Sequence, residues 1–170
     1  MHKEMEHVLA ALTPSNALVM RVILHTGMRV SDVLELRTDQ IKASGWYTEG
    51  KTGKRRRYGL PANLLAQILE QAGPYWAFPG RVSPSKHRTR QTVWADVKRA
   101  QRAFRMPQNV GTHTARKIYA VDLMAKYGNI EAVRRNLNHS SSSVTALYAM
   151  ADQLVARRQH ARKAGQGAGA

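Results

Sequence analysis

The stretch GWYTEGKTGKRRRYGLP, residues 45–61, decides the fold class because it interrupts a chain that is otherwise helical in pattern. Two short segments, WYTE and RRRYGL, lie on either side of the turn residues Lys51-Thr52-Gly53-Lys54. Such segments, joined by a turn that contains glycine, are typical of an antiparallel hairpin. We therefore predict one β-hairpin here, and the rest of the chain carries no other convincing strand signal.

Helical patterns lie on both sides of this hairpin. Before it, one helix begins at Thr13-Pro14 and ends near Thr26-Gly27, and a short second helix has Asp32 in its first turn. After it, helices are predicted over residues 62–72, 90–104, 114–127, 130–136 and 142–158. The predicted fold class is α+β, mainly α-helical, with a small antiparallel hairpin at one edge.

The composition points to a polyanionic partner. The 170 residues suit one domain with its own core, and 27 Lys and Arg face only 11 Asp and Glu, which gives a net charge of +16. Nucleic acid is the leading partner, because no apolar run approaches the length of a membrane span.

The absence of cysteine excludes disulfides, cysteine-bound zinc and a thiol nucleophile. A cytosolic protein is expected, since the N-terminus is too charged for a secretory signal.

The motif THTARK, residues 112–117, carries the first candidate for chemistry. His113 and Arg116 are three positions apart and therefore share one face near a helix start, where free N–H groups favour an anionic oxygen. From its spacing alone, the pair is equally well explained as two solvated surface residues.

Four further residues widen this candidate site. Arg29 follows TGM at a tight turn between helices, and Lys51 begins the hairpin turn. His139 follows a helix end, and Tyr148 lies nine positions later in the last predicted helix. Together with the THTARK pair, these side chains are available to a single phosphodiester.

This set of residues resembles the tyrosine recombinases, the phage integrase family. The resemblance is colinear from about Thr13 to Ala156 and rests on the motifs TGMRVSDVLELR, GKTGKRRRYGLP, HTAR, LNH and SVTALYA. It implies the DNA breaking-rejoining fold, with a catalytic domain over residues 1–160 and a flexible tail over 161–170. The family's separate N-terminal core-binding domain is expected to be absent, which leaves a fragment and a natural minimal recombinase as alternatives.

The resemblance also implies a reaction. Tyr148 is expected to cleave one DNA strand, forming a 3′-phosphotyrosyl bond and a free 5′ hydroxyl without metal, cofactor or ATP. Tyr47, Tyr58, Tyr75, Tyr119 and Tyr127 are the other tyrosines, and the distance from LNH selects Tyr148. Forked hydrogen bonds from Arg29 and Arg116 would stabilise the charge that grows on the non-bridging oxygens.

The remaining roles follow from the same resemblance. Lys51, preferred over Lys54, is expected to protonate the leaving 5′ oxygen, and His113 and His139 to bond the phosphate or move the tyrosine proton. Asp32 stands where the family more often has glutamate, and it is expected to support the site by hydrogen bonds. Asn138 stands where the family usually has glycine, and it also tolerates a left-handed turn.

The implied partner is double-stranded DNA with specific recombination sites, which a homo-tetramer would hold. Accessory DNA-bending proteins are further expected partners, and no contact with a membrane is expected. We expect the protein to be encoded by a bacterium or a phage and to act in the bacterial cytoplasm, at the nucleoid. The predicted phosphate contacts are Lys54, Arg55, Arg56, Arg57, Arg88 and Arg90. Two alternatives stay open, a DNA-binding module without cleavage and a type IB topoisomerase-like enzyme.

Overall fold

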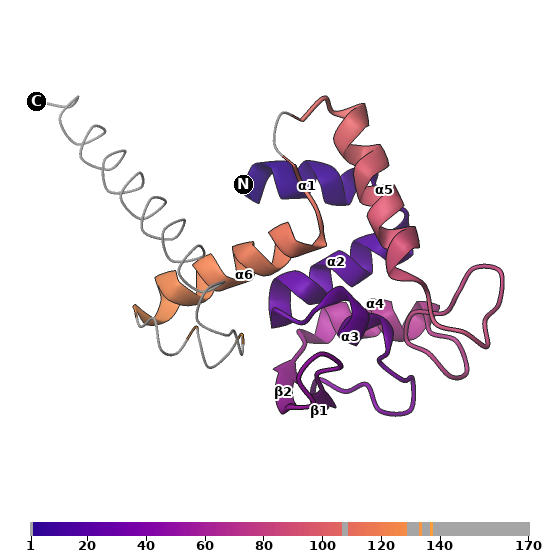
Figure 1. Cartoon of the computed structure of the whole chain (residues 1–170). Helices are drawn as coiled ribbons and strands as arrows, with labels where there is room; N and C mark the ends of the chain where they lie inside the picture. The colour runs from indigo at the N-terminus through magenta and orange to yellow at the C-terminus, as the bar shows by residue number, and fades with distance from the viewer. Residues whose placement is uncertain (1, 107–108, 129–132, 134–136, 138–170) are drawn as a thin grey trace, which may run out of the picture. The chain divides into compact units, whose positions relative to one another are not determined.

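The computed structural model describes residues 2–106, 109–128, 133 and 137. The chain divides into two compact units, Met1–Tyr119 and Ala120–Ala170. No helix within the described residues is both long enough and apolar enough to cross a bilayer. In chain order the elements are α1 (His2–Ala11), α2 (Pro14–Thr26), α3 (Val30–Leu34), β1 (Ser44–Thr48), β2 (Arg55–Gly59), α4 (Ala62–Gln71), α5 (Arg90–Ala103) and α6 (Thr112–Tyr127), as labelled in Figure 1.

α2 is the central helix of the first unit. It contacts α1, α3, α4, α5 and β2, and Figure 1 shows it among them. Residues 16–20, Val22 and Ile23 are buried because the sequence NALVMRVIL is apolar around almost the whole helix. α2 ends at Gly27, whose φ of 65° lies in the left-handed region and whose N–H donates to the Ile23 carbonyl at 2.8 Å.

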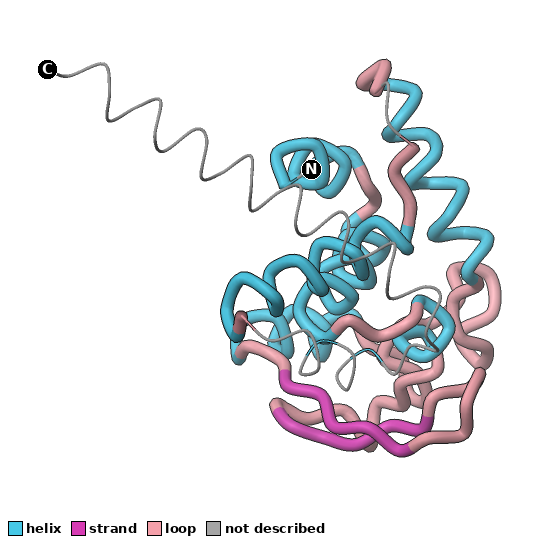
Figure 2. The backbone as a smooth tube through the Cα atoms, turned by 60° about the vertical axis from the view of Figure 1, so that its left-hand side comes forward, coloured by secondary structure: helices cyan, strands magenta, loops and turns pink. Residues whose placement is uncertain are grey.

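The hairpin lies at one edge of the helices, where Figure 2 shows its two strands in magenta. Its strands are antiparallel, with Ser44 opposite Gly59 and Thr48 opposite Arg55. Tyr58 is buried and belongs to the same hydrophobic core as α2, so it anchors the hairpin to the helices. The predicted hairpin and the predicted α+β class, mainly helical, are therefore confirmed.

The helices agree with the sequence patterns except at the N-terminus. α2, α4 and α5 fall where they were predicted, and α6 begins at Thr112, two residues before the predicted start. α1 was not predicted, although its apolar residues recur at helical spacing and are buried, namely Met5, Val8 and Leu9. Of the predicted helix 130–136 only residue 133 is described, and the predicted helix 142–158 lies outside the described residues.

Candidate active site

Arg29 is held at the junction between α2 and α3. It is the N-cap residue of α3, in extended conformation, and it follows Gly27 and the buried Met28. From this short connection the Arg29 side chain extends to the hairpin loop, residues 49–54, where Nη1 lies 2.8 Å from Glu49 Oε1. The side chain keeps 18% of its surface exposed, which leaves it accessible to a ligand.

Asp32 connects α3 to the hairpin loop. Its carboxylate is buried, and Oδ1 accepts hydrogen bonds from the backbone N–H of Gly50 at 3.2 Å and from Ser31 Oγ at 3.5 Å. Oδ2 lies 3.9 Å from Arg29 Nη1. Asp32 therefore fixes the start of the loop that carries Lys51.

A second buried carboxylate, Glu49, completes the link to the hairpin. Its Oε1 lies 2.8 Å from Arg29 Nη1 and 2.9 Å from Arg56 Nη1, and its side chain has no exposed surface. Glu49 was not among the predicted site residues. The available signal was a single acidic residue in a hairpin whose other charged residues are all basic.

Arg116 comes from the first turns of α6, far away in the sequence. It is 5% exposed, and its Nη1 donates a hydrogen bond to the Gly27 carbonyl at 2.5 Å. Burial, and next the positive charge of Arg29, lower the pKa of Arg116 to about 10, so the guanidinium remains charged at neutral pH. The turn that ends α2 therefore brings Arg29 and Arg116 into one cluster.

Tyr47 projects from β1 toward the same cluster. Burial, opposed by the positive charge of Arg56, raises the pKa of Tyr47 to about 12. Its hydroxyl is buried and makes no hydrogen bond within the described residues, as is also the case for Arg29 Nη1 and Asp32 Oδ2. Buried polar atoms without hydrogen bonds are uncommon in folded proteins, so the concentration of three of them here marks a site.

Lys51 and His113 are both exposed. Lys51 lies in the hairpin loop between the strands, and His113 lies three residues before Arg116 on α6. Of the predicted catalytic set, Arg29 and Arg116 are thus buried or partly buried, whereas Lys51 and His113, two of the three candidates for proton transfer, face solvent.

Comparison with known proteins identifies the family, since residues 1–154 match the model of the Phage integrase family. The chain belongs to the phage integrase family. It is 28% identical over 140 residues to the probable integrase/recombinase YoeC of Bacillus subtilis, covering 79% of this chain and 76% of YoeC. It is 26% identical over 149 residues to the tyrosine recombinase XerC of Bradyrhizobium diazoefficiens, covering 78% of this chain but only 44% of that XerC.

Solved structures show the same fold as this member of the phage integrase family. The XerA recombinase superimposes with a TM-score of 0.71 at 15% identity, over 94% of this chain and 62% of XerA. The catalytic domain of bacteriophage HP1 integrase gives 0.63 at 22% identity, over 89% and 86%. A lambda integrase tetramer bound to a Holliday junction gives 0.67 at 17% identity, over 86% and 46%.

Two residues of the predicted integrase set, His139 and Tyr148, lie outside the described residues. Of the other predicted site residues, the structure brings together Arg29, Asp32 and Arg116, and it places Lys51 on the adjoining hairpin loop.

The predicted phosphate contacts of this integrase-family chain fall into separate groups. Arg55 and Arg57 are exposed on the outer face of the hairpin, where the Arg55 guanidinium lies 5.2 Å from the centre of the Trp46 ring. Arg56, which alternates with them along β2, is partly buried and pairs with Glu49. The other three, Lys54, Arg88 and Arg90, lie in the hairpin loop and around the start of α5, with Lys54 and Arg90 exposed.

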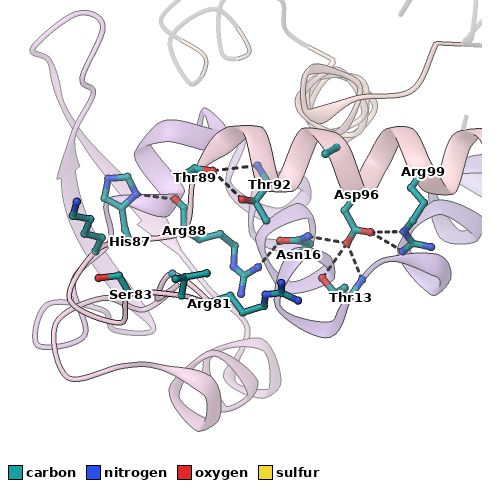
Figure 3. Close-up of a pocket in the computed structure, with 14 residues that line it drawn as sticks. Thr13, Asn16, Arg81, Ser83, His87, Arg88, Thr89, Thr92, Asp96 and Arg99 are labelled. Atoms are coloured by element: carbon teal, nitrogen blue, oxygen red, sulfur yellow. Dashed lines mark hydrogen bonds and ion pairs between the residues drawn. The ribbon is translucent and has the colours of Figure 1, made fainter.

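A separate polar cluster joins α5 to the start of α2, as Figure 3 shows. Asp96 Oδ2 accepts hydrogen bonds from the backbone and hydroxyl of Thr13, both at 2.9 Å, and from Asn16 Nδ2 at 2.7 Å. Arg99 Nη2 donates to Oδ1 at 2.6 Å. A cavity of about 590 Å³ adjoins this cluster, and Arg88 beside it donates to Asn16 Oδ1 at 3.2 Å. The contacts of Asp96 with Thr13 and Asn16 join α5 to the start of α2, whereas its contact with Arg99 lies within α5.

Proposed function

We propose that this chain is the catalytic unit of a site-specific tyrosine recombinase, which cleaves and rejoins double-stranded DNA strands. One observation carries the proposal: Arg29 and Arg116, far apart in the sequence, lie in a single buried cluster with more positive than negative charge. Such a cluster suits the non-bridging oxygens of a phosphodiester. Membership in the phage integrase family supports the same conclusion.

The proposed chemistry is an exchange of phosphate esters. The Tyr148 hydroxyl attacks phosphorus, a bond from phosphorus to the tyrosine oxygen forms, and the bond to the 5′ oxygen breaks. Tyr148 loses its proton and the leaving 5′ oxygen gains one, and Arg29 and Arg116 stabilise the additional charge of the transition state. Rejoining reverses these steps with a DNA hydroxyl as the attacking group, so neither metal nor ATP is needed.

Proton transfer is assigned to Lys51 and the two histidines. Lys51 lies on an exposed loop that Asp32 holds through Gly50, so its ammonium has the reach and freedom to donate a proton to the 5′ oxygen. His113, and with it His139, is assigned to the phosphate or to the tyrosine proton.

The proposed active assembly is a homo-tetramer on DNA that carries specific recombination sites, assisted by accessory DNA-bending proteins at the bacterial nucleoid in the cytoplasm. The tetramer of lambda integrase on a Holliday junction supports this proposal through the shared fold. Residues 1–160 would form the catalytic unit and 161–170 a tail. The chain spans 44% of the XerC that it matches, so the activity of the whole recombinase is part of the proposal.

A nicked suicide substrate tests the proposal. The duplex carries candidate attachment sites from the DNA beside the gene, and the nick lets the 5′ fragment diffuse away so that the covalent intermediate accumulates. We expect a protein–DNA adduct that survives denaturation in the presence of EDTA. The adduct should disappear in Tyr148→Phe and persist in Tyr75→Phe, a matched change at an exposed tyrosine.

Other outcomes would assign a different function. DNA binding without any adduct would favour the DNA-binding module. An adduct accompanied by relaxation of supercoiled plasmid, without exchange between two sites, would favour the topoisomerase-like enzyme.

A further inference from the structure

Glu49 is the feature of the cluster that neither the reaction nor the sequence pattern explains. Its backbone is fixed by the hairpin loop, because its N–H donates to the Lys54 carbonyl at 3.0 Å and its own carbonyl accepts from Gly53 at 2.8 Å. The side chain is held as well, since Oε2 accepts from Thr52 Oγ1 at 2.7 Å. Glu49 therefore places a carboxylate at a defined point inside the cluster.

A buried carboxylate is costly, and stability alone does not explain it. The free-energy cost of removing the Glu49 charge from water is offset by its attraction to Arg29 and Arg56. An apolar pair of similar volume is nevertheless often at least as stable as a buried ion pair. The arrangement is accordingly better explained by what it does to the two arginines.

The contact with Arg29 is close without being a hydrogen bond. Arg29 Nη1 lies 2.8 Å from Glu49 Oε1, yet it has no hydrogen-bond partner among the described residues, so its N–H groups are not aligned with that oxygen. The same atom of Glu49 accepts a true hydrogen bond from Arg56 Nη1 at 2.9 Å. At this atom Arg29 is thus held by charge rather than by an aligned hydrogen bond, while 18% of the surface of its side chain stays exposed.

The charge balance indicates the consequence. Among the described residues of this cluster, Arg29, Arg56 and Arg116 contribute three guanidinium groups, and Asp32 and Glu49 contribute two carboxylates, which leaves one positive charge within this set. One phosphodiester neutralises that charge. Without Glu49, a second positive charge would attract the ground-state phosphate more strongly, although catalysis gains only from interactions that strengthen in the transition state.

We propose that Glu49 is a positioning residue of the phosphate site, which fixes Arg29 and Arg56 and offsets one of their charges so that ground-state DNA is held no more tightly than turnover requires. This inference rests on the proposed recombinase function. It concerns a residue that acts through the arginines and does not itself touch the reacting atoms.

The variant Glu49→Gln separates charge from shape, because glutamine keeps the length of the side chain and can still accept from Thr52. At saturating nicked duplex we expect adduct formation to slow about tenfold or more, since the arginines lose their alignment. The affinity for the duplex should rise about two- to fivefold, since one more positive charge faces the phosphate. The matched control is Glu35→Gln, which removes an exposed carboxylate at the end of α3 and should change neither quantity.

Three results would overturn the proposal. The first is unchanged adduct formation and affinity in Glu49→Gln. The second is a joint loss of rate, affinity and melting temperature, which would make Glu49 a merely structural residue. The third is an equal effect of Glu35→Gln, which would reduce the effect to overall charge.

A comparison in the Tyr148→Phe background keeps this test independent of cleavage. If wild type forms no adduct, the proposed function fails, but duplex affinity can still be measured. Tighter binding by the Glu49→Gln/Tyr148→Phe protein than by Tyr148→Phe alone would still support the charge-offsetting role of Glu49. Equal or weaker binding would reject it.

Discussion

Arg116 shows why an arginine occupies the buried position beside Arg29. Burial and the neighbouring positive charge lower its pKa to about 10, and a guanidinium tolerates this shift because its ordinary pKa is so high. Its planar fork of five N–H donors also lets one nitrogen donate to the Gly27 carbonyl, which a single ammonium group could do only without that fixed geometry.

Arg116→Lys should slow adduct formation by at least about 100-fold, because lysine lacks the fork. The residual activity should also fall as the pH rises from 7 to 9, because the same environment lowers the pKa of a lysine toward neutral pH and the charged form is the useful one. Wild type should show no such fall in this range. Rates measured on a nicked duplex at several pH values check both expectations, and a pH-independent Arg116→Lys rate would contradict the second.

Tyr47 provides a second test at the residue scale. Its hydroxyl is buried without a hydrogen bond within the described residues, so removing it relieves a desolvation cost. Tyr47→Phe should therefore be as stable as wild type or more stable by about 1 kcal/mol. Because a pKa of about 12 makes Tyr47 a poor nucleophile, the adduct should persist. Thermal unfolding and the adduct assay measure these outcomes, and loss of the adduct would give Tyr47 a role in the chemistry.

At the scale of elements, Asp96 joins the start of α2 to α5. Burial by itself would raise its pKa, but the hydrogen bonds from Asn16, Thr13 and Arg99 outweigh this and lower the pKa below its usual value. A carboxylate with a lowered folded-state pKa adds stability above the unfolded-state pKa, and that stability is lost as the pH falls through the folded-state value.

Asp96→Asn should destabilise the protein by about 2 kcal/mol at pH 7, because an amide cannot accept all of these hydrogen bonds. The difference from wild type should begin to shrink near pH 4, where the aspartate of the unfolded chain starts to protonate, and should shrink further as the pH falls through the lower folded-state pKa. Chemical unfolding at pH 7 and pH 3 provides the comparison. An equal difference at both values would show that the charge of Asp96 contributes nothing.

Local patterns predicted the elements better than the contacts between them. The proline at the start of α2, the glycine after it and the turn residues of the hairpin are each specified within a few neighbouring residues. The first helix had the apolar spacing of an amphipathic helix, but the charged residues and histidines interspersed along it carried no distinct start signal. Glu49 could not be placed, because its two arginine partners are brought to it by the turn after α2 and by strand pairing.

At the scale of the whole molecule, the basic residues differ in how deeply they are buried. The net charge of +16 is far above what solubility needs, and β2 alternates between one arginine turned toward the cluster and two turned outward. The inner Arg56 belongs to the proposed phosphate site, whereas Arg55 and Arg57 form an outer basic face. The two groups should affect DNA binding and cleavage differently.

The double variant Arg55→Gln/Arg57→Gln should weaken duplex binding at every DNA sequence and make it less sensitive to salt. If both side chains bind phosphates, the slope of log affinity against log salt should fall by nearly two, at about 0.9 for each phosphate that is no longer neutralised. The adduct rate at saturating DNA should remain unchanged, because neither side chain faces the Glu49 cluster.

Fluorescence anisotropy across a salt series measures the slope, with Lys3→Gln/Arg21→Gln as a control that removes equal charge from α1 and α2. An unchanged slope, or an equal change in the control, would mean that the outer face of the hairpin does not contact DNA.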